Sequence, residues 1–324
     1  MSVVSQKFIK VTYPRKNSLF LYKILKQVGN RLHYSFKSNQ IKRIISQVLS
    51  VVKPSGRVFL IPKPKSGAEN TGTRMITFMS ANLWHDWPRN RKLMERLECF
   101  VQLVLNEHVD ILLVQELIRT NDFQADKWLS EKLGMAYIYS RSNGNDQGIG
   151  FEEGLAIFSR FPIKNHRLAQ LSDPTNPFSR RMALATNIET EWGDFDVYSV
   201  HLGILSSQNR AQLSRLQAWV DEQSGRLPAV IGGDFNAHED TPQMRSVQRT
   251  WRDSYRFLNP SGKDHSHELR WPWGNIIRKS RLDYLFFRQE SDHLIIDEAR
   301  YIDTFECPLS DHRPVLAKAT FNQI

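Results

Sequence analysis

Polar and charged side chains follow the apolar segments of this chain at positions where a protein core has no use for them. Asn82 ends one apolar segment, Glu116 follows a second and His201 follows a third. Such residues at the tips of buried strands are how a rigid scaffold presents a functional site. The complete candidate set is Asn82, Glu116, His201, Asp234, Asn236, Asp283, Asp311 and His312.

The candidates contain carboxylates, amides and imidazoles but no cysteine, so the metal that suits them is a hard, oxygen-binding cation. We expect Mg²⁺, with Mn²⁺ able to replace it, and we expect Glu116 as its first ligand with Asn82 and Asp283 close by. Asp311 and His312 are neighbours on an extended chain, so they point in opposite directions and serve different partners. A histidine facing a phosphate can donate to developing charge, while a carboxylate accepts a proton from water.

Strands and helices alternate downstream of residue 74. Apolar patterning predicts strands over residues 75–83, 111–114, 154–158, 182–188, 195–200, 229–231, 282–286 and 314–319. Helical periodicity predicts helices over residues 89–107, 123–133 and 207–222. Strands outnumber helices and some follow one another directly, so we expect sheet packed on sheet with helices outside.

The chain divides by charge and composition near residue 70. Residues 62–72 combine Pro, Gly and small polar residues, which mark a linker. Residues 1–70 carry fourteen Lys or Arg side chains and one acid, a net charge of +13, so the rest of the chain carries −3 of the total of +10. Apolar residues recur between these basic ones at helical spacing. We predict a basic amphipathic arm over 1–70, partly helical or disordered, and a catalytic domain over 71–324.

Composition indicates a globular protein, because 40% of the residues are hydrophobic and 24% are charged. No apolar run reaches the roughly 18 residues that cross a bilayer, so we expect no transmembrane helix. Cys99 and Cys307 are too few and too far apart to suggest a disulfide framework or a zinc site, which favours a reducing compartment. We expect a cytoplasmic monomer, peripheral to a membrane through its arm, with organelle targeting by the arm as the alternative.

Several short motifs occur in a fixed order. They are Asn82, Gln115-Glu116, Phe158-Ser-Arg-Phe-Pro162, Val200-His201-Leu, Gly233-Asp234-Phe-Asn236, Arg281-Leu-Asp283-Tyr and Ser310-Asp311-His312-Arg-Pro. This ordered series resembles the endonuclease/exonuclease/phosphatase superfamily over residues 75–321. Each motif alone could be a turn or a strand end, but the joint order is specific. The resemblance implies an α/β (α+β) fold, a four-layer sandwich of two packed mixed β-sheets flanked by helices, and metal-dependent hydrolysis of a phosphate ester.

The resemblance also implies a role for each residue. Glu116 would bind the metal with Asn82 beside it, and Asp234 would activate or orient the attacking water. Asn236 and His201 would hold phosphoryl oxygens, and His312 would stabilise the transition state. The remaining roles are that Asp283 and Asp311 orient histidines or a second metal, and that Arg160 contacts phosphate. His201 is similar to the residue of deoxyribonuclease I, sphingomyelinases and inositol phosphatases rather than to abasic-site endonucleases.

Three functions fit this reading. The first is a phosphodiesterase acting on nucleic acid, favoured by the metal constellation and the basic arm. The second is a phospholipid or phosphoinositide headgroup hydrolase at a membrane surface, since each basic residue near an anionic bilayer contributes about 1 kcal/mol, and the acidic body weakens duplex binding. The third is a non-catalytic binding module, which the complete motif series disfavours. Trp271-Pro-Trp273 could stack on a base, enter a lipid interface or pack in the core.

Overall fold

A computed structural model describes residues 58–61, 74–87, 89–145, 150–173, 180–271, 274–288 and 293–322. Most of the predicted arm, residues 1–57 and 62–73, lies outside these described residues. No described helix is long and apolar enough to span a membrane.

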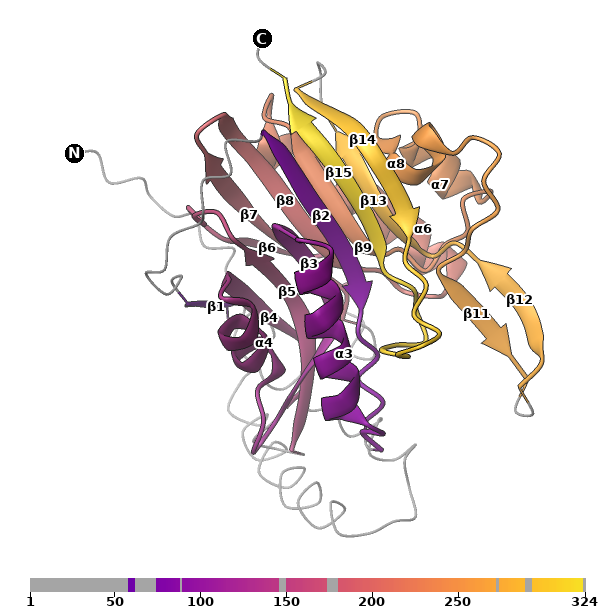
Figure 1. Ribbon diagram of the computed structural model, residues 1–324. Helices are drawn as coiled ribbons and strands as arrows, with labels where there is room; N and C mark the ends of the chain where they lie inside the picture. The colour runs from indigo at the N-terminus through magenta and orange to yellow at the C-terminus, as the bar shows by residue number, and fades with distance from the viewer. Residues whose placement is uncertain are drawn as a thin grey trace, which may run out of the picture.

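The fold is built on two large sheets (Figure 1). The first has seven strands in the order β1-β4-β5-β3-β2-β15-β14 and the second has six in the order β10-β13-β9-β8-β7-β6. The first sheet contains β1 (Val58–Ile61), β2 (Met75–Asn82), β3 (Ile111–Thr120), β4 (Ala136–Asn145), β5 (Phe151–Ser159), β14 (Leu294–Tyr301) and β15 (Val315–Phe321). The second contains β6 (Arg167–Gln170), β7 (Met182–Thr190), β8 (Gly193–His201), β9 (Ala229–Asp234), β10 (Arg252–Asp253) and β13 (Asp283–Arg288).

Helices cover the outer face of each sheet. They are α3 (Leu93–Asn106), α4 (Ala125–Leu133), α6 (Ser206–Ser224) and α7 (Pro242–Val247), whereas α8 (Ser254–Leu258) lies against β13 and β14 and places Tyr255 in the core between the sheets. The apolar side chains of α3 and α4 form one core with the first sheet, and those of α6 and α7 form another with the second sheet. A third core, including Phe78 and Leu285, fills the space between the sheets. The four-layer sandwich with helices on both outer faces is thereby confirmed.

The strand directions bring the candidate residues to one edge of the sandwich. β2 and β3 are parallel, with Asn82 opposite Gln115. In the second sheet β8 and β9 are parallel, with His201 opposite Asp234, and β13 begins at Asp283 opposite the same Asp234. Parallel strands end on the same side of a sheet, so polar residues that follow them in the sequence become neighbours in space.

Two expectations need correction. Residues 58–61 were assigned to the arm, but they form β1, which extends the first sheet. β1 pairs antiparallel with β4, with Val58 opposite Ser140 and Ile61 opposite Tyr137. The cysteines were expected to be unpaired, but Cys99 and Cys307 form a disulfide with a Cα–Cα distance of 6.0 Å. The two cysteines are 208 residues apart in the sequence, but they become neighbours in space because α3 packs beside the loop before β15. The cysteine argument for a reducing compartment therefore loses its basis.

Candidate active site

Glu116 lies in a β-bulge of β3. The pairing of β3 with β5 shifts register between Val114 and Leu117, and Glu116 has a left-handed backbone with φ of 54°. A bulge re-aims one side chain of a strand, and strained backbone of this kind concentrates at functional sites. The bulge turns the Glu116 carboxylate toward Asn82, whose amide nitrogen lies 3.3 Å from Oε1.

Asn82 joins carboxylates that come from different sheets. Its buried amide nitrogen donates to Glu116 and also to Asp234 Oδ2, at 3.2 Å. Its amide oxygen accepts a hydrogen bond of 3.0 Å from the backbone nitrogen of Trp84. In this arrangement the amide nitrogen of Asn82 orients both carboxylates, while its amide oxygen is hydrogen-bonded to the backbone of the loop that follows.

Asp234 and Asn236 form a compact turn after β9. The Asn236 backbone nitrogen donates to Asp234 Oδ1 at 2.9 Å, and its amide nitrogen donates to Asp234 Oδ2 and to the Leu202 carbonyl. The turn needs glycine at position 233, because a Cβ there would lie 2.0 Å from the Val200 carbonyl oxygen. The turn therefore fixes Asp234 from both sides.

Asp283 and His312 form a buried pair. His312 Nδ1 lies 2.7 Å from Asp283 Oδ2, and the Asp283 backbone nitrogen donates to Ser266 Oγ at 3.0 Å. Within the described part of the chain, Asp283 Oδ1 is buried and has no hydrogen-bond partner. A buried carboxylate oxygen without a partner is costly, so it points to a ligand, a cation or water that completes the site.

Three ionisable side chains of the site have pKa values shifted from their ordinary values. Burial and the charge of Asp283 raise the pKa of Asp234 to about 7, although His312 opposes this shift. Burial would lower the pKa of His312, but its ion pair and hydrogen bond with Asp283 outweigh burial and raise the pKa well above its ordinary value. Burial, with a smaller contribution from Arg181, lowers the pKa of His201 well below its ordinary value. Near neutral pH the site thus contains a cationic His312, a neutral His201 and a carboxyl at Asp234 that can exchange a proton.

His201 lies against the carboxylate that its strand partner provides. Its Nε2 is 3.5 Å from Asp234 Oδ2. The imidazole is therefore within reach of the same phosphoryl group that Asp234 and Asn236 would face.

Three sets of side chains bring ligand atoms close enough to share a cation. They are Asp234, Asp283 and His312; His85, Glu116 and Glu153; and His267, Asp311 and His312, with the ligand atoms of each set within 4.8 Å of one another. Carboxylate oxygens dominate the first two sets, and the unpaired oxygen of Asp283 belongs to the first. The carboxylate oxygens fit a hard divalent cation, whereas His312 in its protonated form has no lone pair to offer one.

Of the predicted residues, only Arg160 is not brought to this cluster. It follows β5, which is antiparallel to β3, so it lies beside the start of β3 rather than its end. Its guanidinium donates to the Val109 carbonyl and lies 4.0 Å from Asp110. The expectation that Arg160 touches substrate phosphate therefore needs correction. Asp311 is exposed beside the Asp283–His312 pair, where it joins the third ligand set.

His85 and Glu153, which lie outside the predicted set of site residues, also reach the site. The His85 backbone nitrogen donates to Glu116 Oε2 at 3.3 Å, and its Nε2 lies 3.6 Å from that oxygen and 3.8 Å from Glu153 Oε2. Asn143 holds the other oxygen of Glu153 at 2.6 Å. Two consecutive acids, Glu152 and Glu153, inside an apolar strand were the signal that could have revealed this contribution.

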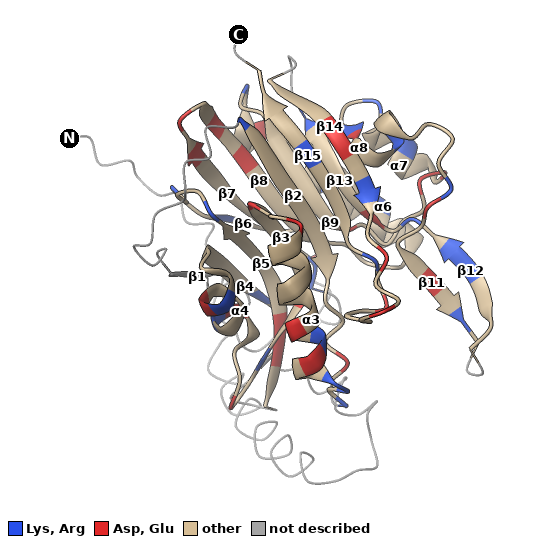
Figure 2. Cartoon of the chain, in the orientation of Figure 1, with Lys and Arg blue, Asp and Glu red and all other residues tan. Residues whose placement is uncertain are grey.

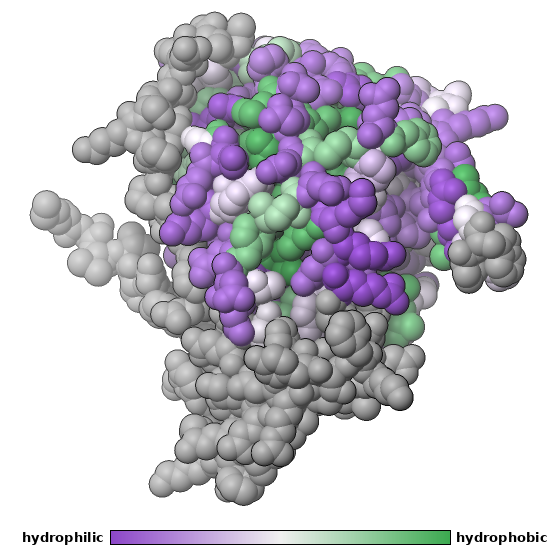
Figure 3. Space-filling view, turned by 60° about the horizontal axis from the view of Figure 1, so that its bottom comes forward, coloured by the Kyte–Doolittle hydropathy of each residue, from purple (hydrophilic) through white to green (hydrophobic). Residues whose placement is uncertain are grey.

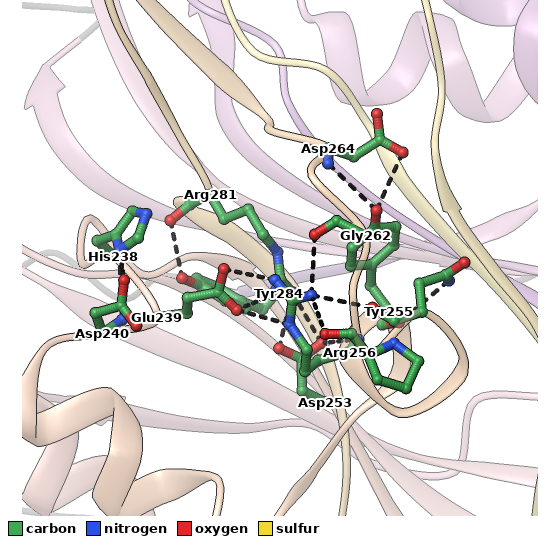
Figure 4. Close-up of polar contacts among 12 residues, drawn as sticks. His238, Glu239, Asp240, Asp253, Tyr255, Arg256, Gly262, Asp264, Arg281 and Tyr284 are labelled. Atoms are coloured by element: carbon green, nitrogen blue, oxygen red, sulfur yellow. Dashed lines mark hydrogen bonds and ion pairs between the residues drawn. The ribbon is translucent and has the colours of Figure 1, made fainter.

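Arg281 lies in the motif that contains Asp283. Its role is to hold the position of Asp283 rather than to contact the substrate. It is buried, donates twice to Asp253 at 2.9 and 2.8 Å, and donates to Glu239 at 2.6 Å (Figure 4). The hydroxyl of Tyr284 donates to the Arg281 carbonyl. These bonds fix the turn that leads into β13 and so the position of Asp283.

Comparisons with known proteins agree with this geometry. The model of the Endonuclease/Exonuclease/phosphatase family matches residues 79–312, which is well over half of the chain. Over 140 residues the chain is 26% identical to the protein YbhP of Escherichia coli strain K12, covering 39% of this chain and 53% of YbhP. The chain thus matches about half the length of that curated relative.

Solved structures share the fold at low sequence identity. An endonuclease/exonuclease/phosphatase from Bacteroides vulgatus has a TM-score of 0.63 at 16% identity, covering 76% of this chain and 99% of that one. The human nocturnin catalytic domain with bound sulfate has a TM-score of 0.62 at 21% identity, covering 76% and 94%. A mannosyl-6-phosphatase from Bacteroides thetaiotaomicron has a TM-score of 0.59 at 20% identity, covering 76% and 100%. This chain belongs to the endonuclease/exonuclease/phosphatase family.

Proposed function

We propose that this protein is a phosphodiesterase that uses Mg²⁺ and a water molecule to break a P–O bond. The observation that carries the proposal is the bridge from Asn82 to Glu116 and Asp234, which places two carboxylates beside the Asp283–His312 pair. The family is generally dependent on divalent metal, and the ligand sets described above suit such a cation. Glu116 would be its first ligand, with Asp283 and Asp311 available to a second cation.

The cation would polarise a phosphoryl oxygen and offset the charge that develops on it. Asp234 accepts the proton of the attacking water, because its pKa of about 7 makes it a base near neutral pH. The His312 cation, held by Asp283, stabilises negative charge on the phosphoryl group. Neutral His201, whose Nε2 lies 3.5 Å from Asp234 Oδ2, orients the phosphoryl group, and Asn236 keeps the Asp234 carboxylate in place.

The substrate class follows from charge and surface. The sequence places nucleic acid first and a phospholipid headgroup second. Residues 71–324 carry a net charge of −3, whereas duplex binding normally needs a positive footprint. Apolar side chains exposed around the site edge give a specific reason to favour the phospholipid. We therefore propose a phospholipid phosphodiester as substrate, with nucleic acid as the competing candidate.

A substrate panel tests this proposal. The full-length protein is assayed with Mg²⁺ and with EDTA on plasmid DNA, RNA, sphingomyelin, phosphoinositides and the soluble diester bis(p-nitrophenyl) phosphate. We expect metal-dependent hydrolysis of the soluble diester and of at least one phospholipid. Turnover that EDTA leaves intact would contradict the metal-dependent mechanism, and preferential cleavage of DNA or RNA would reverse the choice of substrate.

A further inference from the structure

Large apolar side chains are exposed on the loops that surround the active site. Among the described residues, Ile204, Phe305 and Leu205 are the three most exposed of this kind, at 75%, 72% and 63%. Ile204 and Leu205 lie in the short loop between β8, which ends at His201, and α6, and Phe305 lies in the loop that leads to His312. Exposed apolar residues gathered at one place mark an interaction surface rather than ordinary scatter.

A projecting hairpin beside the same site carries further exposed apolar side chains. Strands β11 (His267–Arg270) and β12 (Ile276–Ser280) form a separate two-stranded sheet that stands away from the body (Figure 1). Leu269, Trp271, Ile276 and Ile277 on this hairpin are each between 41% and 49% exposed. In Figure 3 the hairpin lies at the right, where green side chains sit among purple ones beside the grey tip. A two-stranded hairpin has no core of its own, and Leu269, Ile276 and Ile277 stay about half exposed to solvent.

Both ends of the hairpin are attached to the Asp283–His312 pair. His267, the first residue of β11, forms a backbone bridge with His312, and the two rings lie 4.8 Å apart. Ser266, just before it, accepts hydrogen bonds from the backbone nitrogens of Leu282 and Asp283. A surface that binds the hairpin is therefore held next to the catalytic residues.

The hairpin also carries more basic than acidic side chains. Arg270, Arg278 and Lys279 face a single acid, Glu268 (Figure 2). Glu268 forms ion pairs with Arg270 and Lys279, while Arg278 is exposed. Basic side chains beside exposed aliphatic and aromatic ones are the composition of an element that lies in the interface of an anionic bilayer. Of the exposed apolar side chains, Trp271 and Phe305 have a flat face on which a nucleic-acid base could stack. The other five are isoleucine or leucine and have none, so the set as a whole favours lipid over a single-stranded nucleic acid.

We propose that this apolar rim docks the active site on an anionic lipid bilayer. The rim consists of Ile204, Leu205, Phe305 and the hairpin residues Leu269, Trp271, Ile276 and Ile277. The inference rests on the proposed function and specifies it further: the scissile phosphodiester belongs to a lipid in the membrane, and the hairpin brings the site to it. The basic arm predicted from the sequence adds charge of the same sign.

The test compares full-length wild type with the double variant Ile276→Ser/Ile277→Ser. The matched control is Ile295→Ser, since Ile295 is 44% exposed but pairs with Thr320 near the C-terminus, at the other end of the sheet from Asn82. Binding is measured by cosedimentation with vesicles of phosphatidylcholine and phosphatidylserine, and with vesicles of phosphatidylcholine alone. Hydrolysis is measured on phospholipid in the vesicles and on bis(p-nitrophenyl) phosphate.

We expect wild type and Ile295→Ser to bind the anionic vesicles and the hairpin variant to bind them roughly 30-fold more weakly, since two half-exposed isoleucines no longer enter the lipid. Vesicle hydrolysis should fall in parallel, while turnover of the soluble diester stays at the wild-type level. Equal vesicle binding and hydrolysis by wild type and the hairpin variant would overturn the docking proposal. Unchanged vesicle binding together with lost binding of plasmid DNA in a gel-shift assay would also overturn it. Absence of soluble turnover in wild type would instead refute the proposed function.

Discussion

Arg96 on α3 connects the loop that follows Asn82 to the loop that leads to Asp311 and His312. Its buried guanidinium donates through Nη1 to the carbonyls of Leu83, Trp84 and Leu309, at 2.9, 3.0 and 3.0 Å. The first two residues follow Asn82, and Leu309 precedes Asp311 and His312. We expect the substitution Arg96→Met to release both loops, while its aliphatic chain keeps the packing of α3.

The contacts set the size of the effect. The Leu83 and Leu309 carbonyls belong to buried residues, and a buried acceptor that loses a charged donor costs about 1 to 3 kcal/mol. Two such acceptors give a loss of about 2 to 6 kcal/mol in the free energy of unfolding. Loops displaced by about 1 Å can cost on the order of 100-fold in rate, so kcat should fall by roughly 10- to 100-fold.

Urea denaturation and turnover of bis(p-nitrophenyl) phosphate measure the two effects. Arg245→Met is the matched control, because Arg245 is an exposed helical arginine and its loss should change stability by less than about 0.5 kcal/mol. An Arg96→Met protein as stable and as active as Arg245→Met would refute the idea that Arg96 positions the loops. A loss of kcat at unchanged KM would support positioning rather than substrate contact.

Three further outcomes follow from the same contacts. Asp283→Asn should lower kcat by roughly 10²- to 10⁴-fold because His312 loses its charged partner. In EDTA the variant should also be less stable than wild type, and this difference should shrink as pH rises. The reason is that the raised pKa of His312 stabilises the folded protein fully below the pKa of His312 in the unfolded chain, and this stabilisation is lost as pH passes the pKa in the folded protein. Cys99→Ser should cost about 4 kcal/mol, because the disulfide closes a loop with ends 208 residues apart, and reductant should abolish the difference from wild type. Asp126→Asn should lower the free energy of unfolding by about 3 to 5 kcal/mol, because Arg119 Nε, now 2.8 Å from Asp126, would stay buried beside a neutral amide. Equal melting temperatures for Asp126→Asn and the exposed control Glu131→Gln would contradict this.

Most of the site could be predicted because its residues follow buried strands. The apolar pattern of β2 ends at Asn82 and that of β9 at Asp234, so local sequence marks both the strand and the residue presented at its end. Within each sheet, parallel pairing brings such ends together, as it does for Asn82 with Gln115 and for His201 with Asp234.

The sequence did not reveal contacts between distant residues. Cys99 and Cys307 meet only because α3 packs against the loop before β15, which no local pattern records. Strand β14 was missed because it is an edge strand, where Ile295 faces solvent and Asp297 and Glu298 interrupt the apolar pattern. Arg160 was misplaced because motif order does not reveal the direction of the strand before it.

The central claim is that side chains from both sheets meet around one phosphate group and a divalent cation. Glu116→Gln tests it most directly, because the substitution keeps the shape of the side chain and removes the charge that the cation needs. Turnover of bis(p-nitrophenyl) phosphate is measured against Mg²⁺ concentration, with circular dichroism to confirm folding and calorimetry to follow Mg²⁺ binding. We expect a folded protein with weakened Mg²⁺ binding and kcat lowered by at least ~100-fold. Wild-type turnover and Mg²⁺ affinity in this variant would contradict the account.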